Sequence, residues 1–230
     1  MNTYLNLERT EGYFSAAWHD SRSPWAKPAT PFITISRESC SGGSRLAELL
    51  AEKFNADRAG SPSWSLFGGN IINQMLQSNH LPGELARFLP EDRVPEVNAT
   101  IGEIVGLHPS LWGLVQKANE TMRRLASAGH VILVGRGANF ATVGLAGGIH
   151  VRLVAPPAYR ARYYAQRFGV SEEVALVHNA RCDAARRRYV SAHFSSAIDN
   201  PSDYDLVINT AQVPLIEAVE LVSAHVLAHA

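Results

Sequence analysis

Cysteine, net charge and long apolar segments are all scarce in this sequence, and each scarcity excludes a class of protein. Cys40 and Cys182 are its only cysteines, too few for a disulfide framework and too far apart for a C-x-x-C zinc site. Basic and acidic residues number 21 each, so the zero formal charge gives no bulk attraction to nucleic acid or anionic membranes. No apolar run reaches the roughly 18 residues of a bilayer span, and the N-terminal residues lack a signal-peptide pattern. We expect a cytoplasmic protein with no nucleic-acid or membrane partner.

The chain does contain enough apolar residues for one α/β domain. Its 230 residues are 46% hydrophobic, which suffices to bury a full core together with a small inserted part. Residues 1–31 are predicted to form an N-terminal arm with a short helix over 6–19, and residues 32–230 the domain itself. Within the domain, residues 55–112 predict a mostly helical insertion with one helix near 69–77. The aromatic residues of the arm are expected to dock on the domain's own core, or on a partner subunit in a possible homodimer.

Residues 32–54 have the pattern of a buried strand, a turn of small residues and an amphipathic helix in immediate succession. The apolar residues of the helix fall on one face; they are Leu46, Leu49, Leu50 and Phe54. A phosphate at the start of this helix would meet unpaired backbone N–H groups and the positive end of the helix dipole. Gly42 and Gly43 would let the backbone approach it closely. The segment therefore predicts a phosphate cradle over residues 39–44.

This loop can be compared with the phosphate-binding pattern G-x-x-x-x-G-K-[ST]. Gly42 and Ser44 occupy its second glycine and its hydroxyl position, whereas Gly43 stands at the lysine and Arg37 at the first glycine. The alternative is a turn rich in serine and glycine that merely joins a strand to a helix.

A second candidate position follows the apolar run Val131–Val134. This run reads as a central strand of a parallel sheet, because it is apolar throughout and has helical patterns on both sides. The helix before it is expected over about 111–128, ended by Gly129. Arg136 follows the strand after Gly135, at the sheet edge where ligands bind in open α/β sheets, and a guanidinium there suits a phosphate. The alternative is an arginine that pairs with a carboxylate at the sheet edge.

The last third of the chain combines two more strands with an arginine-rich helical stretch. Strands are predicted over 150–155 and 203–210, and a helix from the N-cap Ser171 to about Phe194. Another helix begins at Pro214. Several arginines of the long helix are expected to face one bound polyanion, although a solvated charged face is the alternative. They are Arg181, Arg187 and Arg188, with Asp183 among them. Four strands that alternate with helices predict a doubly wound domain, in which residues 210–213 form a wall for a nucleobase.

Six segments then occur in a recognisable order. They are Ile33-Thr-Ile-Ser-Arg-Glu38, Ser41-Gly-Gly43, Val131-Ile-Leu-Val-Gly-Arg-Gly-Ala-Asn139, Val151-Arg-Leu-Val-Ala-Pro156, Arg181-x-Asp-x-x-Arg-Arg187 and Tyr204-Asp-Leu-Val-Ile-Asn-Thr210. This set resembles the cytidylate kinase-like family of P-loop nucleoside monophosphate kinases. The resemblance implies a P-loop kinase-like three-layer α/β/α fold with a central parallel sheet. It also implies an acceptor-binding helical insertion over 55–112 and an arginine-rich lid region over 157–198.

The resemblance further implies ATP and Mg²⁺ as cofactors and phosphoryl transfer to a nucleoside monophosphate such as CMP, or to a related small acceptor. The residues that it assigns to catalysis are Arg136, Arg181, Asp183 and Arg187. Those that it assigns to the nucleotide are Arg37, Ser39, Cys40, Ser41, Gly42, Gly43, Ser44, Arg45 and Arg186, with Ser44 also on the metal. Because Gly43 replaces the lysine, Arg37 or Arg45 is left to supply the missing charge. The alternative function is a catalytically weak relative that binds a nucleotide or a partner protein and acts in regulation.

Overall fold

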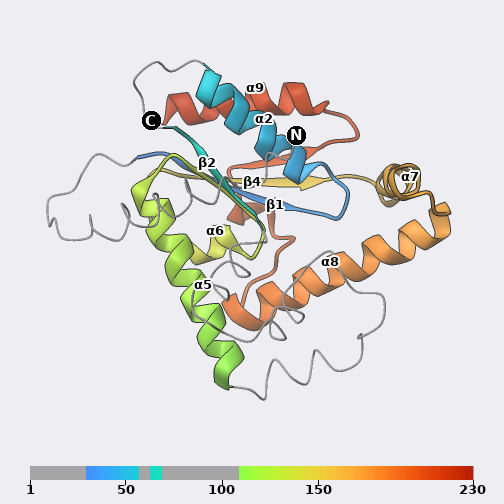
Figure 1. Ribbon diagram of the computed structural model, residues 1–230, viewed down its shortest axis with the longest axis horizontal. Helices are drawn as coiled ribbons and strands as arrows, with labels where there is room; N and C mark the ends of the chain where they lie inside the picture. The colour runs from blue at the N-terminus through green and yellow to red at the C-terminus, as the bar shows by residue number, and fades with distance from the viewer. Residues whose placement is uncertain (1–29, 57–62, 69–108, 230) are drawn as a thin grey trace, which may run out of the picture.

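A computed structural model describes residues 30–56, 63–68 and 109–229 (Figure 1). The described elements follow one another as β1 Phe32–Arg37, α2 Gly43–Ala56, β2 Ser65–Phe67, α5 Pro109–Ala128, β3 Val131–Val134, α6 Ala138–Ala141, β4 Gly148–Val154, α7 Pro157–Phe168, α8 Glu172–Phe194, the 3₁₀ turn η2 Pro201–Asp203, β5 Leu206–Asn209 and α9 Leu215–Ala228. Strands thus alternate with helices along the chain.

The five described strands form one parallel sheet in the order β2-β3-β1-β4-β5. β1 lies in the middle, and Ile33 pairs with Ile132 of β3 on one side and with Ile149 of β4 on the other. Because the sheet is covered on both faces, β3 is apolar throughout and all four of its residues are buried. The carboxyl ends of β1, β3 and β4 consequently lie side by side at one edge.

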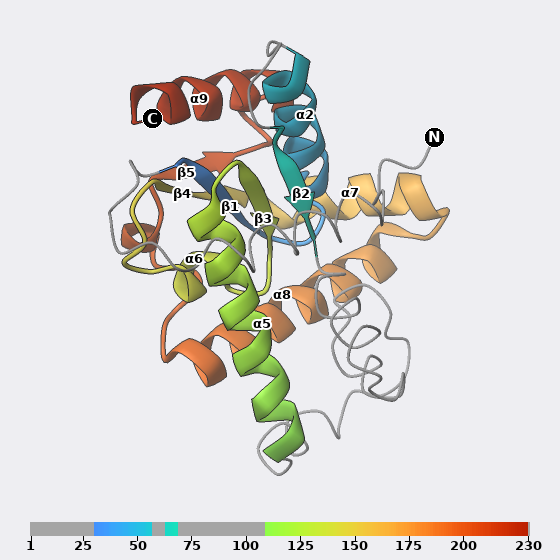
Figure 2. The same ribbon diagram turned by 60° about the vertical axis from the view of Figure 1, so that its left-hand side comes forward.

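Helices cover both faces of this sheet (Figures 1 and 2). On one face α2 and α9 bury Leu50 and Val222 in a core cluster with the isoleucines of β1. On the other face α5 and α6 bury Leu125 and Ala141 in a second cluster. α7 and α8 pack against each other beside the carboxyl edge of the sheet, and Figure 1 shows α7 nearly end-on while α8 runs across the view. The predicted three-layer α/β/α architecture is therefore confirmed.

Most of the local predictions agree with these elements to within a few residues. The N-cap is confirmed, because Ser171 Oγ accepts a hydrogen bond from the Val174 N–H at the start of α8. Gly129 ends α5 with a left-handed φ of 76°, and its N–H donates to the carbonyl of Leu125. Pro214 directly precedes α9.

One strand was missed. Residues 55–112 were expected to form a mostly helical insertion, yet residues 65–67 pair with β3 as the edge strand β2. Three residues give too short a pattern for a strand to be recognised from sequence. The helices predicted over 6–19 and 69–77, and the docking of the N-terminal aromatic residues, lie outside the described residues.

The carboxyl-terminal end of α8 is seated against α6. Phe194 stacks on Phe140 with ring centroids 5.7 Å apart. It also lies where a Cβ at Gly137 would be, so this glycine permits the close approach, and its left-handed φ of 66° favours glycine as well. α8 is thus anchored at this end and passes the carboxyl edge of the sheet along its middle.

Candidate functional site

The loop between β1 and α2 is compact and built from small side chains. Ser39 and Ser41 are buried, and Ser41 Oγ donates to the Glu38 carbonyl at 2.9 Å. Cys40 and Gly42 adopt left-handed φ angles of 60° and 89°. α2 begins directly afterwards at Gly43, so its first N–H groups have no acceptor within the helix. The loop therefore has the shape of a turn that presents a helix N-terminus.

Asp183 of α8 lies against this loop, although 144 residues separate it from Ser39. Its Oδ1 accepts from the Ser39 N–H at 2.7 Å and from Arg186 Nη1 at 3.2 Å. Its Oδ2 accepts from Arg160 Nη1 at 2.7 Å. The Asp183 side chain is 8% exposed, so these contacts compensate for the burial of its charge. One carboxylate thus ties α7, α8 and the loop together.

Arg160 of α7 reinforces the same junction. Its Nη1 also donates to the Ser39 carbonyl at 3.1 Å, and its Nε donates to the Ala155 carbonyl at 2.8 Å. Glu38 lies 3.4 Å from Arg160 Nε and accepts from the Ala155 N–H at 2.9 Å. Asn179 of α8 accepts from Ser39 Oγ at 2.9 Å. Ser39 is therefore held at its N–H, its carbonyl and its hydroxyl.

A second ionic group lies beside the first. Arg152 of β4 is 5% exposed at its side chain, donates to Ser36 Oγ at 2.9 Å and pairs with Asp199. Asp199 also accepts from Arg187 Nε at 2.7 Å. The ring of Tyr204 lies against the Arg152 guanidinium. Burial raises the pKa of the Tyr204 hydroxyl above its usual value. Arg187 is thereby held at the end of the sheet.

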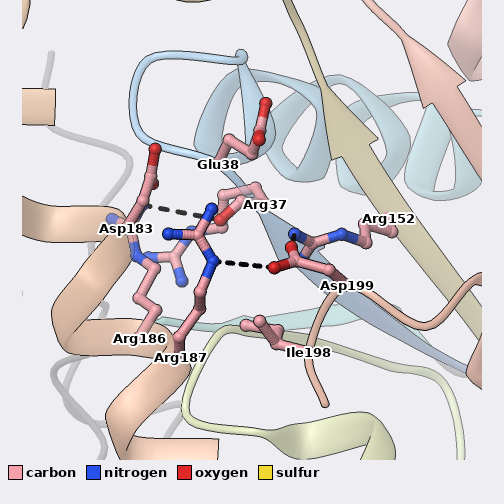
Figure 3. A pocket seen from close by; sticks show the side chains of 8 residues that line it. All are labelled: Arg37, Glu38, Arg152, Asp183, Arg186, Arg187, Ile198 and Asp199. Atoms are coloured by element: carbon pink, nitrogen blue, oxygen red, sulfur yellow. Dashed lines mark hydrogen bonds and ion pairs between the residues drawn. The ribbon is translucent and has the colours of Figure 1, made fainter. Parts of the chain in front are cut away.

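A pocket opens between these two groups (Figure 3). Four arginines and three carboxylates line it with one apolar side chain; they are Arg37, Arg152, Arg186, Arg187, Glu38, Asp183, Asp199 and Ile198. The arginines come from β1, β4 and α8, so residues far apart in sequence converge at the carboxyl edge of the sheet. This is the edge where open α/β sheets bind ligands.

Arg136 follows β3 at the same edge. The Gly135 N–H donates to the Ile35 carbonyl at 3.0 Å, which fixes this turn beside β1. Arg136 has a left-handed φ of 55°, and its Nε is buried without a hydrogen-bond partner among the described residues. A buried donor without an acceptor is costly, and an anionic ligand would satisfy it.

A model of the cytidylate kinase-like family matches residues 32–212 of this chain. The chain belongs to the cytidylate kinase-like family. The match spans every strand of the sheet, the loop at α2 and the two ionic groups around the pocket.

The chain is also similar to several solved structures. An uncharacterised protein from Eubacterium ventriosum ATCC 27560 is 18% identical, with a TM-score of 0.64 over 86% of this chain and 98% of that one. A gluconokinase from Sinorhizobium meliloti 1021 is 16% identical, with a TM-score of 0.46 over 88% and 94%. A shikimate kinase from Bacteroides thetaiotaomicron is 14% identical, with a TM-score of 0.44 over 86% and 98%. No curated protein sequence matches the chain.

Some of the predicted site residues of this family member meet at the pocket and others do not. Arg37, Asp183, Arg186 and Arg187 line it. Arg181 is exposed and does not line it, because two residues turn an α-helix by about 200° and so separate Arg181 from Asp183. Arg188 is exposed as well, outside the pocket lining.

Arg45 also lies outside the pocket lining. Its guanidinium is paired on its own helix, 3.1 Å from Glu48 and 3.6 Å from Glu52, and its side chain is 52% exposed. These acidic partners lie one and two turns further along α2, so they draw Arg45 away from the start of the helix.

Sequence reasoning missed several polar residues that build the site. Arg152 carried a signal, since it is a charged residue within the strand predicted over 150–155, and a buried charge requires a partner. Glu38, Arg160, Asn179 and Asp199 carried no local signal, because each is defined by a contact with a distant segment.

The described residues contain neither a cluster of potential metal ligands nor a membrane-spanning helix. In the described ranges, no three histidine, cysteine, aspartate or glutamate side chains cluster as a metal site would require. The helices of the same ranges include none that is both long and apolar enough to cross a membrane.

Proposed function

We propose that this protein transfers the γ-phosphoryl group of ATP to a nucleoside monophosphate, such as CMP, or to a related small acceptor. The observation that carries this proposal combines three components: a pocket lined by arginines of α8, the loop that Asp183 at this pocket holds through the Ser39 N–H, and the N-terminus of α2 that follows the loop. A binding site for a polyphosphate needs these three components together. Membership of a kinase-like family favours the same reaction.

The loop is proposed to bind the ATP phosphates. Its left-handed residues Cys40 and Gly42 turn the backbone, so the N–H groups in the first turn of α2 are available to phosphate oxygens, whereas the Ser39 and Ser41 N–H groups already donate to Asp183 and to the Glu38 carbonyl. Leu215, which begins α9, lies beside Gly42, so the loop after β5 borders the cradle. This neighbourhood supports residues 210–213 as the wall for the nucleobase.

Magnesium is proposed to bind at Ser44, in the first turn of α2. In phosphate sites Mg²⁺ is held by few protein ligands together with phosphate oxygens and retained waters, so one hydroxyl in the first turn of the helix can take part. When bound, the ion would neutralise charge on the β- and γ-phosphates.

The arginines are proposed to orient the acceptor and to stabilise charge. Arg136, whose buried Nε has no partner among the described residues, would hold the acceptor phosphate. Arg186 and Arg187 would face the phosphoryl group as the bond to the β-phosphate oxygen breaks and the bond to the acceptor oxygen forms. Such a transfer requires in-line positioning and charge stabilisation more than covalent chemistry. Asp183 acts as a positioning residue, because it holds Arg186 and the Ser39 N–H together.

ATP consumption in the presence of magnesium and a panel of nucleoside monophosphates tests this reaction. We expect turnover that depends on one acceptor. Arg136→Ala should raise the KM for that acceptor about 10- to 100-fold, because a charged hydrogen bond contributes about 1.5–3 kcal/mol, while the KM for ATP stays near the wild-type value. Arg124→Ala, which removes an exposed arginine of α5, is the matched control.

Two other outcomes would distinguish the kinase from the regulatory relative or contradict nucleotide binding altogether. ATP binding without turnover on any acceptor would favour a regulatory relative that binds nucleotide. Absence of ATP binding to the folded wild-type protein would contradict the kinase and the nucleotide-binding relative alike. Unchanged acceptor kinetics in Arg136→Ala would remove Arg136 from the acceptor site.

A further inference from the structure

Gly43 opens α2 at the position where the P-loop pattern has its lysine, and the side chain of Arg37 lies over it. A Cβ added to Gly43 would lie 2.8 Å from Arg37 Cγ, 2.9 Å from Arg37 Cβ and 3.2 Å from Arg37 Cδ. Contacts of 2.8 and 2.9 Å are too short for carbon atoms, whose best separation is about 3.5–4.0 Å. The stem of Arg37 therefore occupies the space in which the side chain of a lysine at this position would start.

This packing makes the two cations mutually exclusive. A lysine at position 43 would displace the stem of Arg37, and Arg37 in its present position requires a residue without a Cβ. The φ of Gly43 is not in the left-handed region, so close approach and not backbone conformation requires this glycine. The loss of the lysine and the presence of Arg37 at the end of β1 are thus two parts of one arrangement.

The charge of Arg37 enters the same region from a different element. Cδ carries Nε directly, so the guanidinium begins one bond from an atom that lies 3.2 Å from the missing Cβ. Arg37 also lines the pocket with Arg186 and Arg187, and Arg186 Nη1 lies 3.5 Å from the Arg37 carbonyl. Arg45, the other candidate, does not line this pocket.

We propose that Arg37 replaces the P-loop lysine, with its guanidinium on the β- and γ-phosphates of the bound nucleotide. This inference rests on the proposed function, since it assigns a residue within that nucleotide site. A guanidinium offers a planar fork that bonds two phosphate oxygens at once, whereas an ammonium acts as a point charge. In this arrangement the cation comes from the end of β1, whereas the lysine of the P-loop pattern comes from the first turn of the following helix.

Four proteins test this relocation: the wild type, Arg37→Met, Gly43→Lys and the double variant Arg37→Ala with Gly43→Lys. Arg37→Met keeps an unbranched stem over Gly43 and removes the charge. We expect it to weaken the binding of Mg-ATP about 10- to 100-fold and to leave AMP binding nearly unchanged, because only ATP has β- and γ-phosphates. Gly43→Lys alone should also weaken ATP binding, because the added side chain collides with Arg37.

The double variant is the decisive protein. Removal of the Arg37 stem makes room for a lysine in its usual place, so we expect ATP affinity to recover to within about tenfold of the wild type. Titration calorimetry gives the affinities, and thermal unfolding of each variant verifies that it is folded. Arg124→Met, at an exposed arginine of α5, is the control for the loss of one positive charge.

The outcomes separate this inference from the proposed function. If the wild type binds ATP and Arg37→Met binds it equally well, Arg37 does not replace the lysine. Equal loss of ATP and AMP affinity in Arg37→Met would also overturn the assignment, as would a folded double variant that binds ATP no better than Arg37→Met. Failure of the wild type itself to bind ATP would instead contradict the proposed function.

Discussion

The position of Cys40 beside the N-terminus of α2 suggests a reactive thiol, but its burial makes the thiolate less favourable. A cysteine near a helix N-terminus often has a lowered pKa. Here burial is the largest influence, and it raises the pKa of the Cys40 thiol above its usual value, while Arg186 and Arg160 lower it by less. The thiol is therefore expected to stay protonated at neutral pH and to act as a small filler of the turn.

Alkylation by iodoacetamide measures this difference directly. Because only the thiolate reacts, Cys40 should react more slowly than a free cysteine at about pH 8, and its rate should keep rising to higher pH than that of the free thiol. Peptide-resolved mass spectrometry separates Cys40 from Cys182. Reaction as fast as free cysteine at neutral pH would contradict the assigned role of burial.

A buried carboxylate ties α8 to its neighbours. Asp183 accepts hydrogen bonds from Ser39, Arg160 and Arg186, so it joins α7 and α8 to the loop. Asp183→Ala removes both carboxylate oxygens, so all three hydrogen bonds are lost and the buried Arg160 keeps fewer partners. We expect a loss of about 3–5 kcal/mol in the free energy of unfolding, the usual cost of breaking a buried ion pair. Urea unfolding provides this value.

Hydrogen exchange locates the part of the molecule that Asp183→Ala destabilises. Amides of residues 157–194 should exchange faster in Asp183→Ala than in the wild type, because the helical pair has lost its tie to the loop. Glu120→Ala, which breaks the exposed pair with Arg124, should change stability by at most about 1 kcal/mol. Equal effects of the two substitutions would show that Asp183 is not the link between these elements.

At the scale of the whole molecule, one sheet is shared by two cores. Leu50 of α2 packs in the cluster on one face and Leu125 of α5 in the cluster on the other, and both side chains are fully buried. Leu50→Ala and Leu125→Ala should each lower the free energy of unfolding by about 2–5 kcal/mol. Because both cores need the same strands, each variant should still unfold in a single transition.

Circular dichroism and tryptophan fluorescence, followed through the same denaturant series, test this coupling. Their midpoints should shift together in both variants. Leu227→Ala, at a side chain of α9 that is 63% exposed, should remain within about 0.5 kcal/mol of the wild type. Separate midpoints for the two probes would mean that the faces of the sheet unfold independently.

The sequence by itself determined the elements whose signals are local. The apolar run Val131–Val134 predicted a central strand, Ser171 predicted the start of α8, and Pro214 predicted the start of α9; all three predictions are confirmed. The order of the motifs also predicted the family. These signals depend on residues within a few positions of one another, so composition and periodicity suffice to read them.

Only the tertiary structure decided which charged residues share a pocket. Asp183 meets Ser39 across 144 residues and Arg152 meets Ser36 across 116, and no local pattern encodes such contacts. The same holds for β2, a strand of three residues that is defined by its pairing with β3. Arg37 and Arg45 were equal candidates in the sequence. In the structure Arg37 packs over Gly43 and lines the pocket, whereas two glutamates hold Arg45 along its own helix.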